Sequence, residues 1–397
     1  MSWPIVTLGE VAVFINGDRG KNYPSKGSFV ESGVAFINAG SLSLEHRVVD
    51  SELNFITQEK YDSLRSGKIE RGDILFCLRG SLGKFAVIEN DLKGAIASSL
   101  VIIRANDKIT LSYLKHYLGS VLCAKEIDTF ENGAAQPNLS ATDLKSFKIP
   151  LPPLDEQKRI AAILDKADAI RQKRKQAIAL ADEFLRSVFL DMFGDPVSNP
   201  KGWEVKPLSE LIMKGDKINY GIVQPGDHVE DGIPIVRVGD IKDGSIDKSK
   251  LKRVARIIDE KHSKSRLVGD EILITCVGAT VGKVALADAS LSGFNTVRAL
   301  TRVRLNEEVN RSFVFRYLQS PFIQGYFQSQ LRTVGQPTLN GKQIGETPIL
   351  LPNLNMQREF LQLSDMAQTA KDLSNSQLIE ADNMFNALSQ KAFSGQL

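Results

Sequence analysis

The stretch Leu151-Pro-Pro-Leu-Asp-Glu-Gln-Lys-Arg-Ile160 decides the fold, because it closes one kind of structure and opens another. Prolines push the residues before them towards extended backbone and are tolerated at a helix start. We therefore expect a globular region to end here and a helix to begin, with Asp155 as its N-cap and acidic residues in its first turn. Gly194-Asp-Pro196 is a typical helix end. The sequence predicts one helix from Asp155 to Phe193.

Apolar positions inside this helix alternate in steps of four and three, which is the spacing of a coiled-coil seam. The middle of the seam holds two arginines, and polar seam positions commonly fix the register of a helix pair. The seam positions are Ile160, Leu164, Ala167, Arg171, Arg174, Ile178, Ala181, Leu185, Val188 and Met192.

The opening stretch recurs after a shift of 200 residues, where Leu351-Pro352, Leu354 and Gln357 match Leu151-Pro152, Leu154 and Gln157. Other matches at the same shift include Trp3 with Trp203, Tyr117-Leu118 with Tyr317-Leu318, and Gln136-Pro137 with Gln336-Pro337. A single shift that holds over the whole length indicates a duplicated unit. The resulting pseudo-twofold suits a protein that reads two half-sites on a duplex or holds two copies of a partner.

A second long helix is therefore predicted from Asn355 to Phe393. Its predicted seam is Phe360, Leu363, Ala367, Ala370, Ser374, Gln377, Ala381, Met384 and Leu388, widened by Met366 and Leu373. If the two helices pack antiparallel, the polar middles of both seams meet and the two globular domains lie at opposite ends. The alternative, in which each helix packs only on its own globular domain, usually needs a wider apolar stripe.

The globular halves are predicted to be mixed and mostly β. In the first copy residues 73–78, 84–88 and 99–103 are short apolar runs typical of buried strands, and residues 271–277, 283–287 and 299–305 are their counterparts. Residues 112–120 and 312–320 are expected to be short helices. The predicted fold class is α+β, with two pseudo-twofold-related domains (1–152 and 196–352) separated by an antiparallel two-helix coiled coil (153–195 and 353–397).

Composition excludes several classes of protein. The 397 residues are 42% hydrophobic and 24% charged, as in ordinary globular domains, and no apolar run reaches the length of a membrane span. The first residues do not resemble a secretory signal, so we expect a cytoplasmic protein. Cys77 and Cys276 fall in matching strands and are expected to be core residues. The four histidines have no zinc-ligand spacing, so no metal site is predicted.

No motif predicts catalysis. Gly278-Ala-Thr-Val-Gly-Lys283 is one residue too short for a phosphate-binding loop and is followed by Val284 instead of Ser or Thr. We expect it, like Gly80–Lys84, to be a tight turn between strands with Lys283 and Lys84 exposed at the tip. The nuclease-like Glu156-Gln-Lys158 is explained by the helix start. An Asn-Pro-Pro-aromatic tetrad for amino-methyl transfer and a G-x-G-x-x-G cofactor loop are both missing from the sequence.

Paired loops are the best candidates for contact with DNA. Arg, Asn and Gln can read base edges, while Lys and Tyr suit phosphates, and such residues recur in matching loops of both copies. A solvated turn is the alternative for each loop taken singly. The candidate DNA-contacting residues are Arg19, Lys21, Asn22, Tyr23, Asn38, Arg79, Ser81, Lys84, Gln136 and Asn138 in the first copy, and Lys217, Asn219, Tyr220, Gln224, Arg237, Thr280, Lys283, Gln336, Thr338 and Asn340 in the second.

The net charge of +3 is by itself weak evidence for DNA binding, but Lys and Arg cluster in three places along the chain. They are Arg19 with Lys21, the segment Lys248–Arg256, and the run Arg171-Gln-Lys-Arg-Lys175. We expect Arg171, Lys173, Arg174 and Lys175 to contact an acidic partner surface or DNA phosphates, although a plain solvated helix face is the alternative.

Taken together, these strings resemble the DNA-specificity subunit of type I restriction–modification systems, over the whole chain. The resemblance is carried by Leu151–Ile160, Phe189-Leu-Asp-Met-Phe-Gly-Asp-Pro196, Leu388-Ser-Gln-Lys-Ala-Phe-Ser-Gly-Gln-Leu397, Gly33–Ile37 with Gly232–Val236, and Tyr220–Gly226.

The resemblance implies two target-recognition domains that each read half of a bipartite DNA site, and a helix pair that spans an unread spacer. It also implies partners: two modification subunits that flip the target adenine and methylate it from S-adenosylmethionine, and restriction subunits that translocate and cut. The chain itself is then expected to bind no cofactor and to be non-catalytic. The alternative function is a free-standing regulator with two DNA-binding domains, which would bind tightly without partners.

Overall fold

The computed structural model describes residues 3–130, 138–331 and 336–397. The chain forms two compact units, one made of residues 1–176 and 374–397 and the other of residues 177–373. We call them unit 1 and unit 2. Each unit contains one globular region and part of both long helices. Within the described residues, no helix is both long enough and apolar enough to span a membrane.

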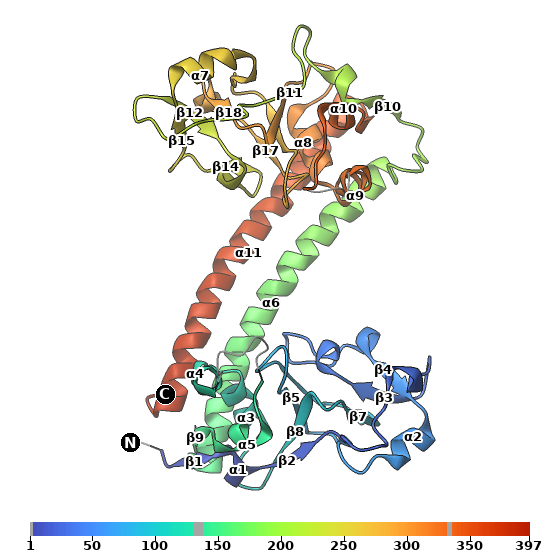
Figure 1. The fold of residues 1–397 in the computed structure, drawn as a ribbon, viewed down its shortest axis with the longest axis vertical. Coiled ribbons are helices and arrows are strands. Elements are labelled where there is room, and N and C mark those ends of the chain that lie inside the picture. The colour runs from blue at the N-terminus through green and yellow to red at the C-terminus, as the bar shows by residue number, and fades with distance from the viewer. Residues whose placement is uncertain (1–2, 131–137, 332–335) are drawn as a thin grey trace. The chain divides into compact units, whose positions relative to one another are not determined.

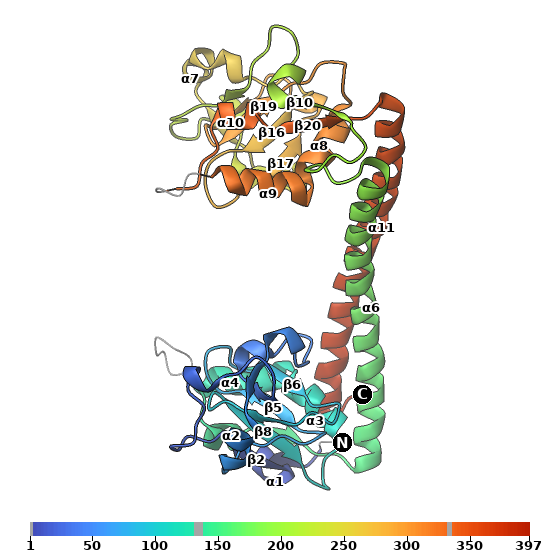
Figure 2. The ribbon, with the colours of Figure 1, turned by 90° about the vertical axis from the view of Figure 1, so that its right-hand side faces the viewer.

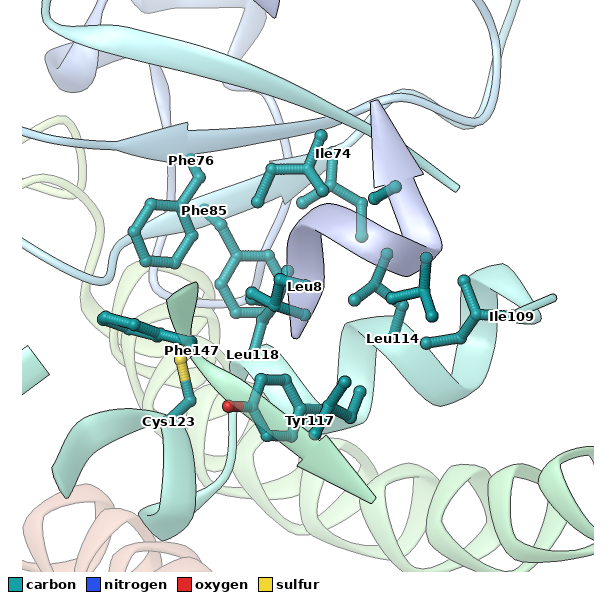
Figure 3. Close-up of a cluster of buried hydrophobic side chains, with 14 of the residues drawn as sticks. Leu8, Ile74, Phe76, Phe85, Ile109, Leu114, Tyr117, Leu118, Cys123 and Phe147 are labelled. Carbon is teal, nitrogen blue, oxygen red and sulfur yellow. The ribbon is translucent and has the colours of Figure 1, made fainter. Parts of the chain in front are cut away.

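Unit 1 is built on a four-stranded antiparallel sheet (Figure 1). In sheet order its strands are β2 (Ala12–Asn16), β8 (Leu100–Ala105), β5 (Ile74–Cys77) and β6 (Phe85–Val87). Successive side chains of a strand point to opposite faces, and β5 is buried on both. Ile74 and Phe76 belong to the core that also contains α3 and α6, whereas Leu75 and Cys77 face a second core beneath β3. Figure 3 shows Ile74 and Phe76 together with other aliphatic and aromatic side chains of the first core.

Two smaller sheets complete unit 1. The strands are β4 (Asn54–Ile56), β3 (Val34–Ile37) and β7 (Gly94–Ile96) in one sheet, and β1 (Ile5–Thr7) with β9 (Lys148–Pro150) in the other. The helices are α1 (Leu8–Val11), α2 (Gln58–Ser63), α3 (Leu111–Leu118), α4 (Val121–Phe130) and α5 (Ala141–Ser146). The β3 and β7 strands are parallel, while the other pairings of these two sheets are antiparallel.

Unit 2 repeats this plan (Figure 2). Its strands are β11 (Asn219–Tyr220), β19 (Leu300–Val303), β16 (Ile272–Thr275) and β17 (Val284–Leu286); β15 (Lys252–Val254), β12 (Ile233–Val236) and β18 (Asn295–Thr296); β10 (Glu204–Pro207) and β20 (Pro348–Leu351); and the hairpin β13 (Ile241–Lys242) and β14 (Ser245–Ile246). Its helices are α7 (Arg256–Lys261), α8 (Arg311–Gln319), α9 (Pro321–Gln330) and α10 (Gly341–Gly345). The predicted strands and short helices of both copies are confirmed, and so is the duplication.

The long helices are α6 (Leu154–Phe193) and α11 (Leu354–Ser394), and they pack antiparallel in each unit. In unit 1, Arg171 Nε lies 2.7 Å from Asp382 Oδ1, and in unit 2, Lys371 Nζ lies 2.7 Å from Asp182 Oδ1. At the 200-residue shift these are the same ion pair, once in each copy. The predicted helix–helix pairing is confirmed. The alternative of helices that pack only on their own globular domains is therefore wrong.

The predicted seam of α6 is confirmed, because each of its positions is buried or half-buried. The predicted seam of α11 is partly wrong: Met366 and Leu373 are 69% and 58% exposed, and Ala370 and Met384 also face solvent. The α6 seam shifted by 200 residues instead falls on buried or half-buried positions throughout. Several of these positions hold small or polar residues, so a search for regularly spaced apolar residues does not find the seam. The shifted positions are Phe360, Ser364, Ala367, Lys371, Ser374, Leu378, Ala381, Phe385, Leu388 and Ala392.

The start of α6 differs from expectation. Asp155 is not the N-cap, because α6 already begins at Leu154; the amides of Glu156 and Gln157 bond to the carbonyl of Pro153, and Asp155 pairs with Lys158. Contact between the polar middles of the two seams stays a prediction. Arg171 contacts Asp382 and stacks on Phe385, with its guanidinium carbon 4.4 Å from the ring centre.

Candidate nucleic-acid interface

The turn that joins the two central strands has the same construction in both units. Between β5 and β6, Gly80 and Gly83 have φ values of 82° and 75°, and between β16 and β17, Gly278 and Gly282 have φ values of 100° and 92°. Only glycine adopts this region without strain, so the glycines are explained by the turn and no nucleotide is required. The predicted tight turns are confirmed. We call them the central turns.

The lysines of the two central turns differ in their exposure to solvent. Lys283 is exposed, as predicted. Lys84 is only half-exposed, because its ammonium group donates to the carbonyl of Ala39, in the 3-10 turn that follows β3, at 3.3 Å. The prediction that Lys84 stands free at the tip is therefore wrong.

Each central turn lies beside the loop that precedes α5 or α10. In unit 1 the amide of Leu139 donates to the carbonyl of Leu78 (2.9 Å), and Arg79 Nε donates to Asn138 Oδ1 (3.1 Å). In unit 2 the amide of Leu339 bonds to the carbonyl of Cys276, 2.9 Å away. The structure thus brings together candidates that are far apart in sequence: Arg79, Ser81 and Asn138 in unit 1, and Thr280, Lys283, Gln336 and Thr338 in unit 2. Gln136 lies outside the described residues.

The first candidate loop of unit 1 is anchored by its own polar residues. Asp18 accepts from the amides of Gly20 (2.7 Å) and Arg65 (2.9 Å), and the Arg65 bond is the main reason that the pKa of Asp18 is lowered. Asn22 donates to the carbonyl of Ser63, and the Tyr23 ring packs edge-on against Phe36 at 5.9 Å. Arg19 and Lys21 are exposed. Asn22 and Tyr23 therefore anchor the loop to the rest of unit 1, and Arg19 and Lys21 of the same loop face solvent.

The matching loop of unit 2 leaves β11 at a glycine that has no room for a side chain. A Cβ on Gly221 would lie 2.0 Å from the carbonyl oxygen of Thr296. The ladder with β19 holds Asn219 and Tyr220, and Asn219 reaches the carbonyl of Lys264 at 3.4 Å. Tyr220 is 61% exposed, and Lys217 and Gln224 are exposed as well. This loop presents an aromatic ring, a cation and an amide to solvent.

Three other candidates are engaged within the protein. Asn38 accepts from the amide of Gly40 (2.7 Å) and caps a short 3-10 turn, and Asn340 accepts from the amide of Gln343 (2.9 Å) and caps α10. The Arg237 guanidinium lies 2.9 Å from Asp240, and this bond raises the pKa of Arg237. These bonds give all three residues a structural role. Contact of these residues with DNA stays a prediction.

The cationic run on α6 also contains both residues that are engaged within the protein and residues that face solvent. Arg171 is held by Asp168, Asp382 and the Phe385 ring, and Arg174 is half-buried. Lys173 and Lys175 are exposed. Of the four candidates for partner contact, these two lysines are the ones whose charges face solvent.

Sequence reasoning missed the structural role of Gln157 and Gln357, which join each long helix to its globular domain. Gln157 is fully buried: its carbonyl oxygen accepts from the amide of Thr110 (2.8 Å), and its Nε2 donates to the carbonyls of Pro152 (2.9 Å) and Lys108 (3.0 Å). Gln357 accepts from the amide of Asn310 (2.8 Å) and donates to the carbonyl of Pro352 (2.7 Å). The signal was present, since both glutamines match at the 200-residue shift.

The thiols have no reactive character. Cys77, Cys123 and Cys276 are buried and free, and burial raises the pKa of all three, that of Cys123 to about 12. The expectation that Cys77 and Cys276 are core residues is confirmed. In the described part of the chain, His, Cys, Asp and Glu form no group of three or more that could hold a metal ion.

Comparison with known proteins decides the family. The profile of the type I restriction modification DNA specificity domain matches residues 2–180 and again residues 200–380. The chain belongs to this family. The two matches coincide with the two copies of the fold, so each copy is one DNA specificity domain.

Individual relatives are similar to this chain in sequence, and a solved structure is similar to it in fold. The specificity subunit of the Escherichia coli type I restriction enzyme EcoBI is 28% identical over 73% of this chain and 66% of its own length. That of EcoKI from E. coli K12 is 21% identical over the whole chain and 89% of its own length. The S subunit from M. genitalium superimposes with a TM-score of 0.57 over 99% of this chain and 96% of its own, at 16% identity, and so shares the fold.

Proposed function

We propose that this chain is the DNA-specificity subunit of a type I restriction–modification complex, in which each unit reads one half of a bipartite site. One observation carries the proposal: the two units share a scaffold but differ in the side chains on it. Beside the central turn, unit 1 pairs Arg79 with Asn138 where unit 2 pairs Val277 with Thr338. To read two different half-sites, the same scaffold must carry different side chains at the positions that contact the bases.

The side chains beside the central turns have the chemistry needed to contact duplex DNA. Arg can bond bidentately to guanine, and Asn and Gln to adenine, in the major groove. Lys21, Lys217 and Lys283 are exposed cations, as expected for groups that hold the phosphate backbone while other residues read bases. We assign base reading to the residues beside the central turns and phosphate contact to the lysines.

Partners supply the remaining functions in this proposal. Two modification subunits would use S-adenosylmethionine, and restriction subunits would translocate and cut, while this chain would bind no cofactor and catalyse no step. The exposed Lys173 and Lys175 would contact a modification subunit or spacer phosphates. A cytoplasmic location follows from the need to reach DNA.

Reconstitution tests this function. The purified chain is expected to show no methyltransferase, nuclease or nucleotidase turnover, and weak binding of duplex DNA in a gel shift. Together with the modification subunits of its system it is expected to direct adenine methylation to one bipartite sequence. Tight sequence-specific binding by the chain alone would favour the free-standing regulator, and turnover that disappears on a point substitution in this chain would show an enzyme.

A further inference from the structure

One segment of unit 2 is far more basic than its counterpart in unit 1. Residues 248–266 contain eight Lys and Arg against two Asp and Glu, whereas residues 48–66 contain two against four. The duplication makes this a matched comparison, because β15 and β4 occupy the same edge of equivalent three-stranded sheets. The difference lies in charge and not in architecture.

Four of these eight Lys and Arg side chains are available to a ligand. Lys248 pairs with Asp288, and Arg266 pairs with Asp259. Lys250, Arg256, Lys261 and Lys264 are exposed, and within the described ranges no carboxylate lies in ion-pair distance of any of them. We call these four residues the basic surface.

The basic surface adjoins the loop that carries Tyr220 and Gln224. Lys252 Nζ donates to the carbonyl of Gly226 at 2.5 Å, which holds the end of that loop against β15. At its other end, Asn219 and Arg302 both donate to the carbonyl of Lys264. Figure 1 shows β12, β15 and α7 together in one part of unit 2. A duplex held by this loop would therefore run next to the four cations of the basic surface.

Unit 1 offers no equivalent at this edge within the residues that the structure describes. The Lys68 and Lys93 ammonium groups lie over the Tyr61 ring, at 4.8 and 5.3 Å from its centre, and Lys93 also donates to Gln58. Asp50, Glu52 and Glu59 of the same segment are exposed.

We propose that the basic surface binds the phosphate backbone of duplex DNA, and that unit 2 thereby supplies a larger share of the salt-dependent affinity than unit 1. The inference rests on the proposed function and adds an asymmetry to it. Each phosphate neutralised by a cation releases counterions, so log K falls with log salt by about 0.9 per contact. Binding would then be anchored by the half-site of unit 2, while unit 1 would contribute mainly through base reading.

The experiment uses the complex with its modification subunits. The test variant is Lys250→Gln, Arg256→Gln and Lys264→Gln together. The control variant is Lys108→Gln, Lys145→Gln and Lys148→Gln, which removes equal charge from exposed positions of unit 1 outside the candidate DNA contacts. Relative to control, the test variant is expected to lower the salt slope by about 2 to 3 and the affinity at 0.1 M salt on the order of 100-fold, for cognate and random duplexes alike. Phosphate ethylation interference is expected to disappear on one half-site only.

The outcomes separate the two claims. If the unaltered complex binds no duplex DNA, the proposed function fails. If it binds and the test variant matches the control in slope and affinity, the basic surface does not face DNA and this inference alone is overturned. Loss of complex assembly with an unchanged slope would assign the surface to a protein partner and would also overturn it. Thermal melting of both variants checks that they fold.

Discussion

Replacing Gln157 by alanine is expected to lower the free energy of unfolding of unit 1 by about 3 kcal/mol. The side chain is fully buried and satisfies the amide of Thr110 and the carbonyls of Pro152 and Lys108. Without it these buried and part-buried backbone groups lose a partner, and each buried group left unsatisfied costs about 1–3 kcal/mol. Because all three lie outside α6, the substitution also loosens the helix from the globular domain.

Denaturation by urea, followed by circular dichroism, measures this effect. The neighbouring exposed Lys158→Ala is the matched control, and its effect is expected to stay within about 0.5 kcal/mol. Gln357→Ala is expected to act in the same way on unit 2, and the two effects should add because the residues lie in different units. A Gln157→Ala variant as stable as Lys158→Ala would show that the glutamine does not tie the helix to the domain.

Adding one heptad to both long helices is expected to lengthen the unread spacer of the DNA site by about three base pairs. Seven residues add about 10.5 Å at 1.5 Å per residue, and a base pair rises about 3.4 Å. Insertions after Gln176 and after Ser376 fall between the ion pairs Arg171–Asp382 and Asp182–Lys371, so the seam continues in phase on both sides. Whole seven-residue insertions keep the heptad, whereas a single turn of four residues would not.

Sequencing of methylated sites in cells that express the complex gives the spacer directly. The matched control carries the insertion in α6 alone, which puts the two seams out of register and is expected to reduce assembly and not to lengthen the spacer. An unchanged spacer with both half-sites still recognised would mean that the helices do not set the distance between them.

The sequence predicted the architecture wherever apolar periodicity or the internal repeat reported on it. Both long helices, the central strands and the glycine turns were found in this way. The seam of α11 was misplaced because Ser364 and Lys371 occupy seam positions without being apolar, while the apolar Met366 and Leu373 face solvent. Shifting the correct α6 seam by 200 residues would have located it, so the repeat was the stronger signal.

The candidate site was predicted less well, because residue type alone does not show which polar groups are already bonded. Asn38 and Asn340 have the chemistry of base-reading residues, but their oxygens cap local turns. Lys84 lies back on the carbonyl of Ala39. The proximity of Arg79 to Asn138 depends on a contact between residues that are 59 apart in the sequence, which no local pattern contains.

Exchange of one domain tests the central claim most directly. Residues 1–150 are replaced by the matching residues of another family member, and the methylated sites of cells expressing each complex are sequenced. Since the first central turn and its neighbouring loop lie within this segment, we expect one half of the bipartite site to change and the other half to remain. A site in which both halves change together, or neither does, would contradict independent reading by the two units.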